Sequence, residues 1–106
     1  MTDTNQPWSE QFRIVAKQWV DADAAASLLE ETKSAVLSRM MVQQGDMPVS
    51  RAEMNVKASQ EWGDFIDSMG AARKSASLLK VKMEYIRMKF TEWQDANATK
   101  RAEMRL

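Results

Sequence analysis

Two long series of apolar residues with heptad spacing constrain this chain more than any other feature. Over residues 8–40 and 62–93, apolar side chains recur in alternating steps of four and three residues, and Lys33 is the single interruption. Such spacing keeps one side of an α-helix against a partner helix over many turns. The two series therefore predict two long helices that pack as a coiled coil. They consist of Trp8, Phe12, Val15, Trp19, Ala22, Ala26, Leu29, Val36 and Met40, and of Trp62, Phe65, Met69, Ala72, Ala76, Leu79, Met83, Ile86, Phe90 and Trp93.

Two of the five Gly and Pro residues lie close together between these two series. Gly45 suits the left-handed position that follows a helix end, and Pro48 cannot continue a helix. Ser50 and Glu53 fit a capping box, in which each side chain caps a backbone N–H of a new helix, and Ser59 can cap another. Because the connection is short, the long helices should run antiparallel. The sequence predicts an all-α, antiparallel helical hairpin in a single domain over residues 1–106, with a helix over about 7–44, a loop and short helix over about 45–58, and a helix over about 60–103.

The residue composition excludes most catalytic chemistry. The chain has no Cys and no His, and it has only three Gly. Thiol nucleophiles, disulfides, imidazole bases and metal sites built from His or Cys are therefore excluded, and a glycine-rich phosphate loop cannot form. We expect a protein that is not an enzyme and that uses no cofactor, no metal and no small-molecule substrate.

The distribution of apolar residues also bears on location. No apolar run approaches the ~18 residues that a membrane span needs. The first residues include Asp3 and Glu10 instead of the basic and then apolar segment of a secretion signal. We therefore expect a cytoplasmic protein with no membrane partner.

Two other protein classes share part of this pattern. Magnesium-dependent nucleotide pyrophosphohydrolases need E-x-x-E and E-x-x-D carboxylate pairs on two helices. Glu61 and Asp64, with Asp67 beyond them, supply the second pair, but Lys33 follows Glu30 where the first pair needs a carboxylate. WXG-type secreted hairpins have Gly two residues after Trp, whereas here Gly follows Trp directly. Both classes fit less well than a non-enzymatic coiled coil.

A second apolar stripe lies on the second long helix. Its positions face away from the seam, the line of heptad residues along which the two long helices pack. The stripe consists of Leu78, Val81, Tyr85 and Met88, which follow one another in steps of three, four and three residues. Full burial of such a side chain is worth ~1.5–3 kcal/mol, so four exposed ones are unfavourable. Either the short middle helix or the N-terminal tail covers this apolar stripe, or it binds other copies of the chain. We expect the second, a homo-oligomer with the stripe as its interface.

Basic residues are concentrated on the same helix. Residues 51–106 contain eleven basic and eight acidic side chains. Between Gly70 and Phe90 there are six basic residues and a single acidic one, Glu84. Basic side chains beside an aromatic ring are typical of surfaces that bind single-stranded nucleic acid. The alternative is an ordinary solvated face, with Arg73 paired to Glu30 and Lys80 to Asp23. The candidate nucleic-acid-binding residues are Lys74, Lys80, Lys82, Tyr85, Arg87 and Lys89.

The residues from Leu28 to Leu106 include the runs LLEETKSAVLSRMM, GDMPVSRAEM, SQEWGDF and KVKMEYIRMKF. In this pattern the chain resembles small helical bacteriophage proteins similar to the UvsY-like recombination mediators. The resemblance implies an oligomeric helical protein that binds single-stranded DNA, assists a recombinase or another replication protein and acts in the host cell cytoplasm. It also implies DNA contacts by the basic residues around Tyr85, which are Lys80, Lys82, Arg87 and Lys89.

A different function fits the same hairpin. A structural or adaptor coiled coil, such as a virion component or an inhibitor of a host protein, would have protein partners only. The two hypotheses differ in whether Lys82 and Lys89 stay unpaired in the oligomer or are covered by acidic residues of another subunit.

Overall fold

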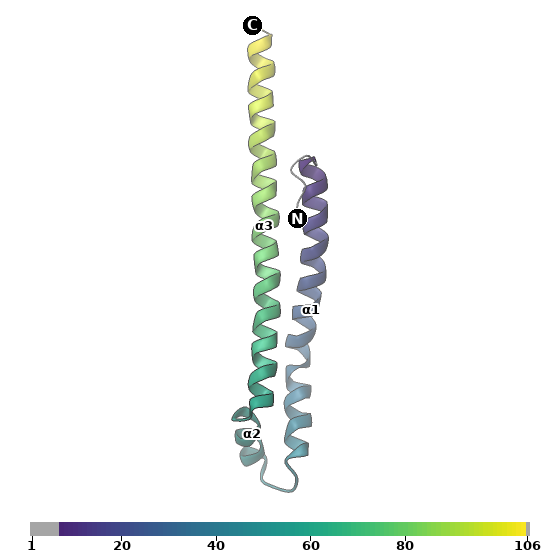
Figure 1. Cartoon of the computed structure of the whole chain (residues 1–106), viewed down its shortest axis with the longest axis vertical. Coiled ribbons are helices and arrows are strands. Elements are labelled where there is room, and N and C mark those ends of the chain that lie inside the picture. Colours follow the sequence, from purple (N-terminus) through teal and green to yellow (C-terminus); the bar gives the residue numbers. More distant parts are fainter. Residues whose placement is uncertain (1–6, 106) are drawn as a thin grey trace. The chain divides into compact units, whose positions relative to one another are not determined.

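Three α-helices account for nearly all of the chain in a computed structural model, which describes residues 7–105 (Figure 1). They are α1 over Trp8–Gln43, α2 over Val49–Lys57 and α3 over Gln60–Met104. Residues 7–105 contain no β-strand. The predicted all-α hairpin of two long helices, with a short helix in the connection, is confirmed.

The turn after α1 depends on Gly45. Its φ of 92° lies in the left-handed region, which glycine adopts without steric cost. Its N–H donates to the carbonyl oxygen of Val42 at 3.2 Å, so a backbone hydrogen bond closes the end of α1. The predicted role of Gly45 is therefore confirmed.

α2 begins before the predicted capping box. Pro48 occupies the N-cap position, its carbonyl oxygen accepts a hydrogen bond from the N–H of Ala52 at 3.0 Å, and no side chain caps the helix. Ser50 already lies inside α2, and Glu53 instead forms an ion pair with Lys57 at 2.8 Å. The predicted capping box of Ser50 and Glu53 is wrong. Pro48, whose ring fixes φ, occupies the N-cap position, so the helix begins before Ser50.

Ser59 caps α3 as predicted. Its Oγ accepts a hydrogen bond from the backbone N–H of Trp62 at 3.2 Å and donates one to the carbonyl oxygen of Val56 at 2.6 Å. One hydroxyl group thus satisfies a donor at the start of α3 and an acceptor at the end of α2.

The described residues fall into two compact units, and both long helices contribute to each unit. The first unit contains residues 7–21, which include the start of α1, and residues 77–105, and its two helical segments run antiparallel and side by side (Figure 1). Val15, Ile86 and the polar Gln11 are buried there. Trp93 is 52% exposed and stacks on Phe90, with ring centroids 6.0 Å apart. The prediction that Trp93 lies in the seam is wrong, because the part of α3 that contains Trp93 extends beyond the first turn of α1 (Figure 1).

The second unit contains residues 22–76, which include all of α2. Ala26 and Ala76 are 0% and 1% exposed, so the two long helices approach closely where their seams carry small residues. Ala52 and Val56, one turn apart, bury one side of α2. Lys33, the single polar residue in the two heptad series, is exposed.

Arg73 links α3 to α1 in the second unit. Its guanidinium donates to Asp23 Oδ1 at 2.7 Å and to the two carboxylate oxygens of Glu30 at 2.8 and 2.9 Å, and it reaches Ser27 Oγ at 3.2 Å. The predicted pairing of Arg73 with Glu30 is present. The predicted pairing of Lys80 with Asp23 is wrong, because Arg73 reaches both carboxylates and Lys80 forms no ion pair within residues 7–105.

Candidate functional site

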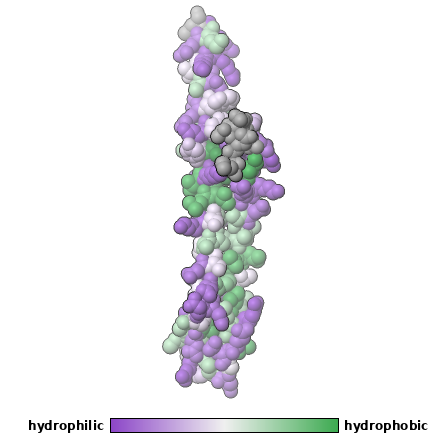
Figure 2. Space-filling view, viewed as in Figure 1, coloured by the Kyte–Doolittle hydropathy of each residue, from purple (hydrophilic) through white to green (hydrophobic). Residues whose placement is uncertain are grey.

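The apolar stripe is exposed in the first unit. Leu78, Val81, Tyr85 and Met88 are 61%, 64%, 54% and 59% exposed. Figure 2 shows hydrophobic side chains that reach the surface among hydrophilic ones on the face in view. The short helix α2 belongs to the second unit and leaves the stripe uncovered. The other possible cover, the N-terminal tail, lies outside the described residues.

Helix geometry explains why the stripe stays outside. Successive residues lie about 100° apart around an α-helix, so steps of three and four keep one line of side chains on one side. The seam on α3 includes Ile86, which is buried, and Met83, which is half-buried. Val81 and Tyr85 lie roughly opposite these two. A single pair of helices therefore cannot bury both lines.

The candidate basic residues lie on two sides of α3. Lys80 and Arg87 are one heptad apart and share one side, and Lys82 and Lys89 share another side about 160° away. Lys74 precedes Leu78 by one turn in the same uninterrupted helix. The structure therefore brings Lys82 and Lys89 together beside the apolar stripe and leaves Lys80 and Arg87 beside the seam.

The surroundings of these basic residues also differ. The Nζ of Lys89 lies 5.6 Å from the centroid of the Tyr85 ring and 3.4 Å from Glu92 Oε2. Lys89 is accordingly half-buried, whereas the other four basic candidates are exposed. Among the described residues, those four form no ion pair. They are Lys74, Lys80, Lys82 and Arg87.

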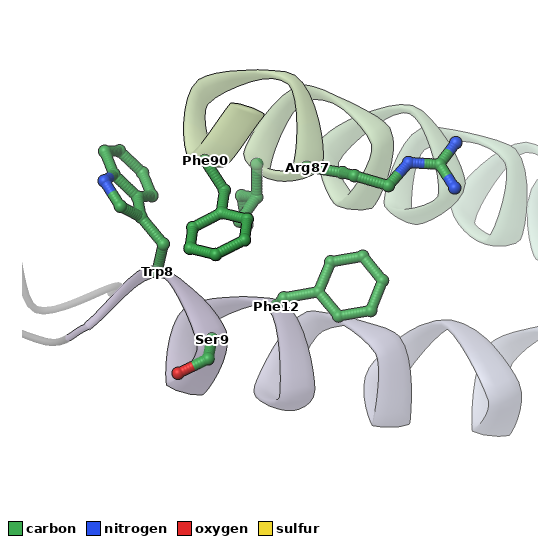
Figure 3. A pocket seen from close by; sticks show the side chains of 6 residues that line it. Trp8, Ser9, Phe12, Arg87 and Phe90 are labelled. Atoms are coloured by element: carbon green, nitrogen blue, oxygen red, sulfur yellow. The ribbon is translucent and has the colours of Figure 1, made fainter. Parts of the chain in front are cut away.

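An aromatic cleft in the first unit is a feature that the heptad pattern did not predict. It has a volume of about 360 Å³ and lies between α3 and the first turns of α1. Figure 3 shows Phe90 of α3 directed toward α1, where Trp8 and Phe12 lie on either side of it, while the guanidinium of Arg87 points away along α3. The concentration of aromatic residues at the ends of both series was the available signal. The cleft is lined by Trp8, Ser9, Phe12, Ile86, Arg87 and Phe90.

The acidic candidates for magnesium do not form a site. Within residues 7–105 no three carboxylates lie close enough together to hold a metal ion. Glu61, Asp64 and Asp67 are exposed, and Asp64 accepts a hydrogen bond from the side-chain amide of Gln60 at 2.8 Å. None of the described helices combines the length and the apolar character needed to cross a membrane.

Comparisons with known proteins supply no further assignment. The chain matches no protein-family model, no curated protein and no solved structure. The surfaces of α3 are therefore the evidence on which a function is proposed.

Proposed function

We propose that this chain is a non-enzymatic, self-associating accessory protein that binds single-stranded DNA through basic residues of α3. The observation that supports it most directly is the set of exposed cations, Lys74, Lys80, Lys82 and Arg87, that form no ion pair among the described residues. A surface cation that forms no ion pair is free to neutralise a phosphate. The expected setting is phage recombination or replication in the host cytoplasm, with a recombinase or another replication protein as a partner.

The proposed contacts are to the DNA backbone. Each phosphate that a Lys or Arg neutralises releases counterions, and this release supplies most of the affinity of such surfaces. Tyr85, which is 54% exposed, could stack on a base, but it also lies in the apolar stripe. If the stripe binds another copy, Tyr85 is covered and phosphate contacts alone remain.

Anisotropy of a fluorescein-labelled deoxythymidine oligomer, titrated at several salt concentrations, tests this proposal. For single strands the slope of log affinity against log salt is about −0.7 per phosphate contacted. Lys82→Gln, at an exposed lysine that forms no ion pair among the described residues, should make the slope shallower by about that amount. Lys33→Gln, at an exposed lysine of α1 in the second unit, is the matched control and should leave the slope unchanged. Absence of binding by the unmodified protein at low salt would refute the proposal.

A second function is favoured by the exposed apolar stripe. Four apolar side chains that are more than half exposed on one helix are typical of a surface that binds protein. A structural or adaptor coiled coil, as a virion component or an inhibitor of a host protein, would use this surface without nucleic acid. This alternative stands if the unmodified protein binds no DNA at low salt.

A further inference from the structure

We infer that the apolar stripe binds a second copy of this chain with the two α3 helices antiparallel, and that this pairing gathers Lys82 and Lys89 of both copies on one edge. The role given to that edge rests on the DNA binding of the proposed function, whereas the orientation of the pair does not.

Side-chain size favours an antiparallel pair. In a two-fold symmetric pair the same surface of each copy contacts the other, so the stripe must complement itself. Antiparallel pairing about the centre of the stripe places Leu78 opposite Met88, and Val81 opposite Tyr85, of the second copy. A small residue then faces a large one on both sides of the centre, which fills the interface evenly. Parallel pairing would instead place two Tyr85 rings against each other and leave two Val81 side chains opposite one another.

Charge at the ends of the stripe favours the same arrangement. Glu92 follows Met88 by one turn; its Oε2 lies 3.4 Å from Lys89 Nζ, and its side chain is still 68% exposed. Parallel helices would bring the two Glu92 carboxylates together in line with the stripe, where they repel each other. Antiparallel helices instead place Glu92 opposite Lys74 of the second copy. Opposite charges thus meet at both ends of the paired stripes.

The symmetry also determines where the other charges lie. A two-fold axis perpendicular to two antiparallel helices keeps the same side of each helix on the same edge of the pair. Lys82 and Lys89 of both copies therefore line one edge over about 18 Å, and Glu84 of both copies lies on the opposite edge. On this edge the Nζ of Lys89 already lies 3.4 Å from Glu92 Oε2 of its own copy. Lys82 forms no ion pair among the described residues, so the Lys82 side chains of the two copies repel each other until an anion neutralises them. A bound phosphate backbone would therefore strengthen pairing, and pairing would strengthen DNA binding by the same factor.

Disulfide cross-linking tests the orientation, because the chain has no native Cys. Leu78→Cys and Met88→Cys are prepared separately and oxidised, each alone and as a mixture, with helix content checked by circular dichroism. Antiparallel pairing predicts a covalent dimer in the mixture only. Residue 78 of one copy then faces residue 88 of the other, whereas the two residues 78, like the two residues 88, lie about 15 Å apart. Covalent dimers in either single variant would indicate parallel pairing and overturn the inference, as would the absence of any dimer.

Binding of the labelled deoxythymidine oligomer by the same mixture tests the shared edge. At protein concentrations low enough to separate uncross-linked pairs, the oxidised mixture should bind DNA at least about tenfold more tightly than the reduced mixture, because it presents twice the lysines. Equal affinity would overturn the shared edge. If the dimer forms only in the mixture but the unmodified protein binds no DNA, the proposed function fails while antiparallel pairing stands.

Discussion

At the scale of single residues, Arg73 connects the two long helices of the second unit. Asp23, Ser27 and Glu30 follow one another on α1 in steps of four and three, so they lie along one side of the helix. The planar guanidinium carries several donors and reaches all three, which the single ammonium of a lysine could not do. The hydrogen bond to Arg73 lowers the pKa of Glu30, and the same bond raises the pKa of Arg73.

The lowered pKa of Glu30 predicts how stability changes with acid. Because the carboxylate is favoured in the folded state, its contribution is present above its ordinary pKa of 4.5 and is lost as pH falls through the folded value. Between about pH 5 and pH 3, the thermal unfolding midpoint of the unmodified protein should therefore fall further than that of Glu30→Gln. Glu31→Gln, at the exposed neighbouring position, should follow the unmodified protein. Parallel curves for all three proteins would contradict this prediction.

Glycine residues give a second prediction at this scale. Gly70 lies within α3, and a Cβ added there meets no atom within 4 Å. Gly70→Ala should therefore raise the free energy of unfolding by ~0.5–1 kcal/mol, since alanine favours the helix. Gly45→Ala should lower it by roughly 1–2 kcal/mol, because φ at Gly45 lies in the left-handed region. Urea unfolding followed by circular dichroism measures both, and a stabilised Gly45→Ala protein would show that the turn is not under this constraint.

At the scale of elements, the heptad series predicted which side of each long helix is buried. Every member of the first series is buried or half-buried, and so is every member of the second up to Phe90. The pattern could not show that α1 begins beside Phe90, because spacing within one helix carries no information about where its partner ends. It also could not show that Arg73 takes both carboxylates, which depends on the reach of one side chain. For the candidate site, the spacing of apolar residues predicted the exposed stripe. The composition, which counts basic residues without placing them, did not show that Lys80 and Lys82 lie on different sides of α3.

The two serines that were candidate caps give a prediction at the element scale. Ser59 Oγ caps α3, whereas Ser50 lies inside α2 and the N-cap position there belongs to Pro48. Ser59→Ala should lower the free energy of unfolding by ~1 kcal/mol, the usual effect of losing a cap. Ser50→Ala should have little effect or stabilise slightly, since alanine favours the helix interior. Urea unfolding distinguishes the two, and an equal loss in both variants would indicate that Ser50 does cap α2.

At the scale of the whole molecule, the two units contain different features. The second unit has α2, the closely packed alanines and the contacts of Arg73. The first has the exposed apolar stripe, the aromatic cleft and most of the unpaired cations. Its core includes Val15 and Ile86, while four apolar side chains of the stripe remain outside. Association of the first unit with another copy would therefore bury the exposed apolar stripe.

If the stripe mediates self-association, stability should depend on protein concentration. Pairing stabilises the folded state by mass action, so the thermal unfolding midpoint should rise as the protein is concentrated. Val81→Glu places a charge in the middle of the stripe and should abolish this rise while circular dichroism shows an unchanged helix content. Val20→Glu is the matched control, because Val20 is 55% exposed on α1 of the first unit and lies outside the stripe. It changes the same residue type and should retain the concentration dependence. A midpoint that is independent of concentration in the unmodified protein, or one that still rises in Val81→Glu, would show that the stripe does not mediate association.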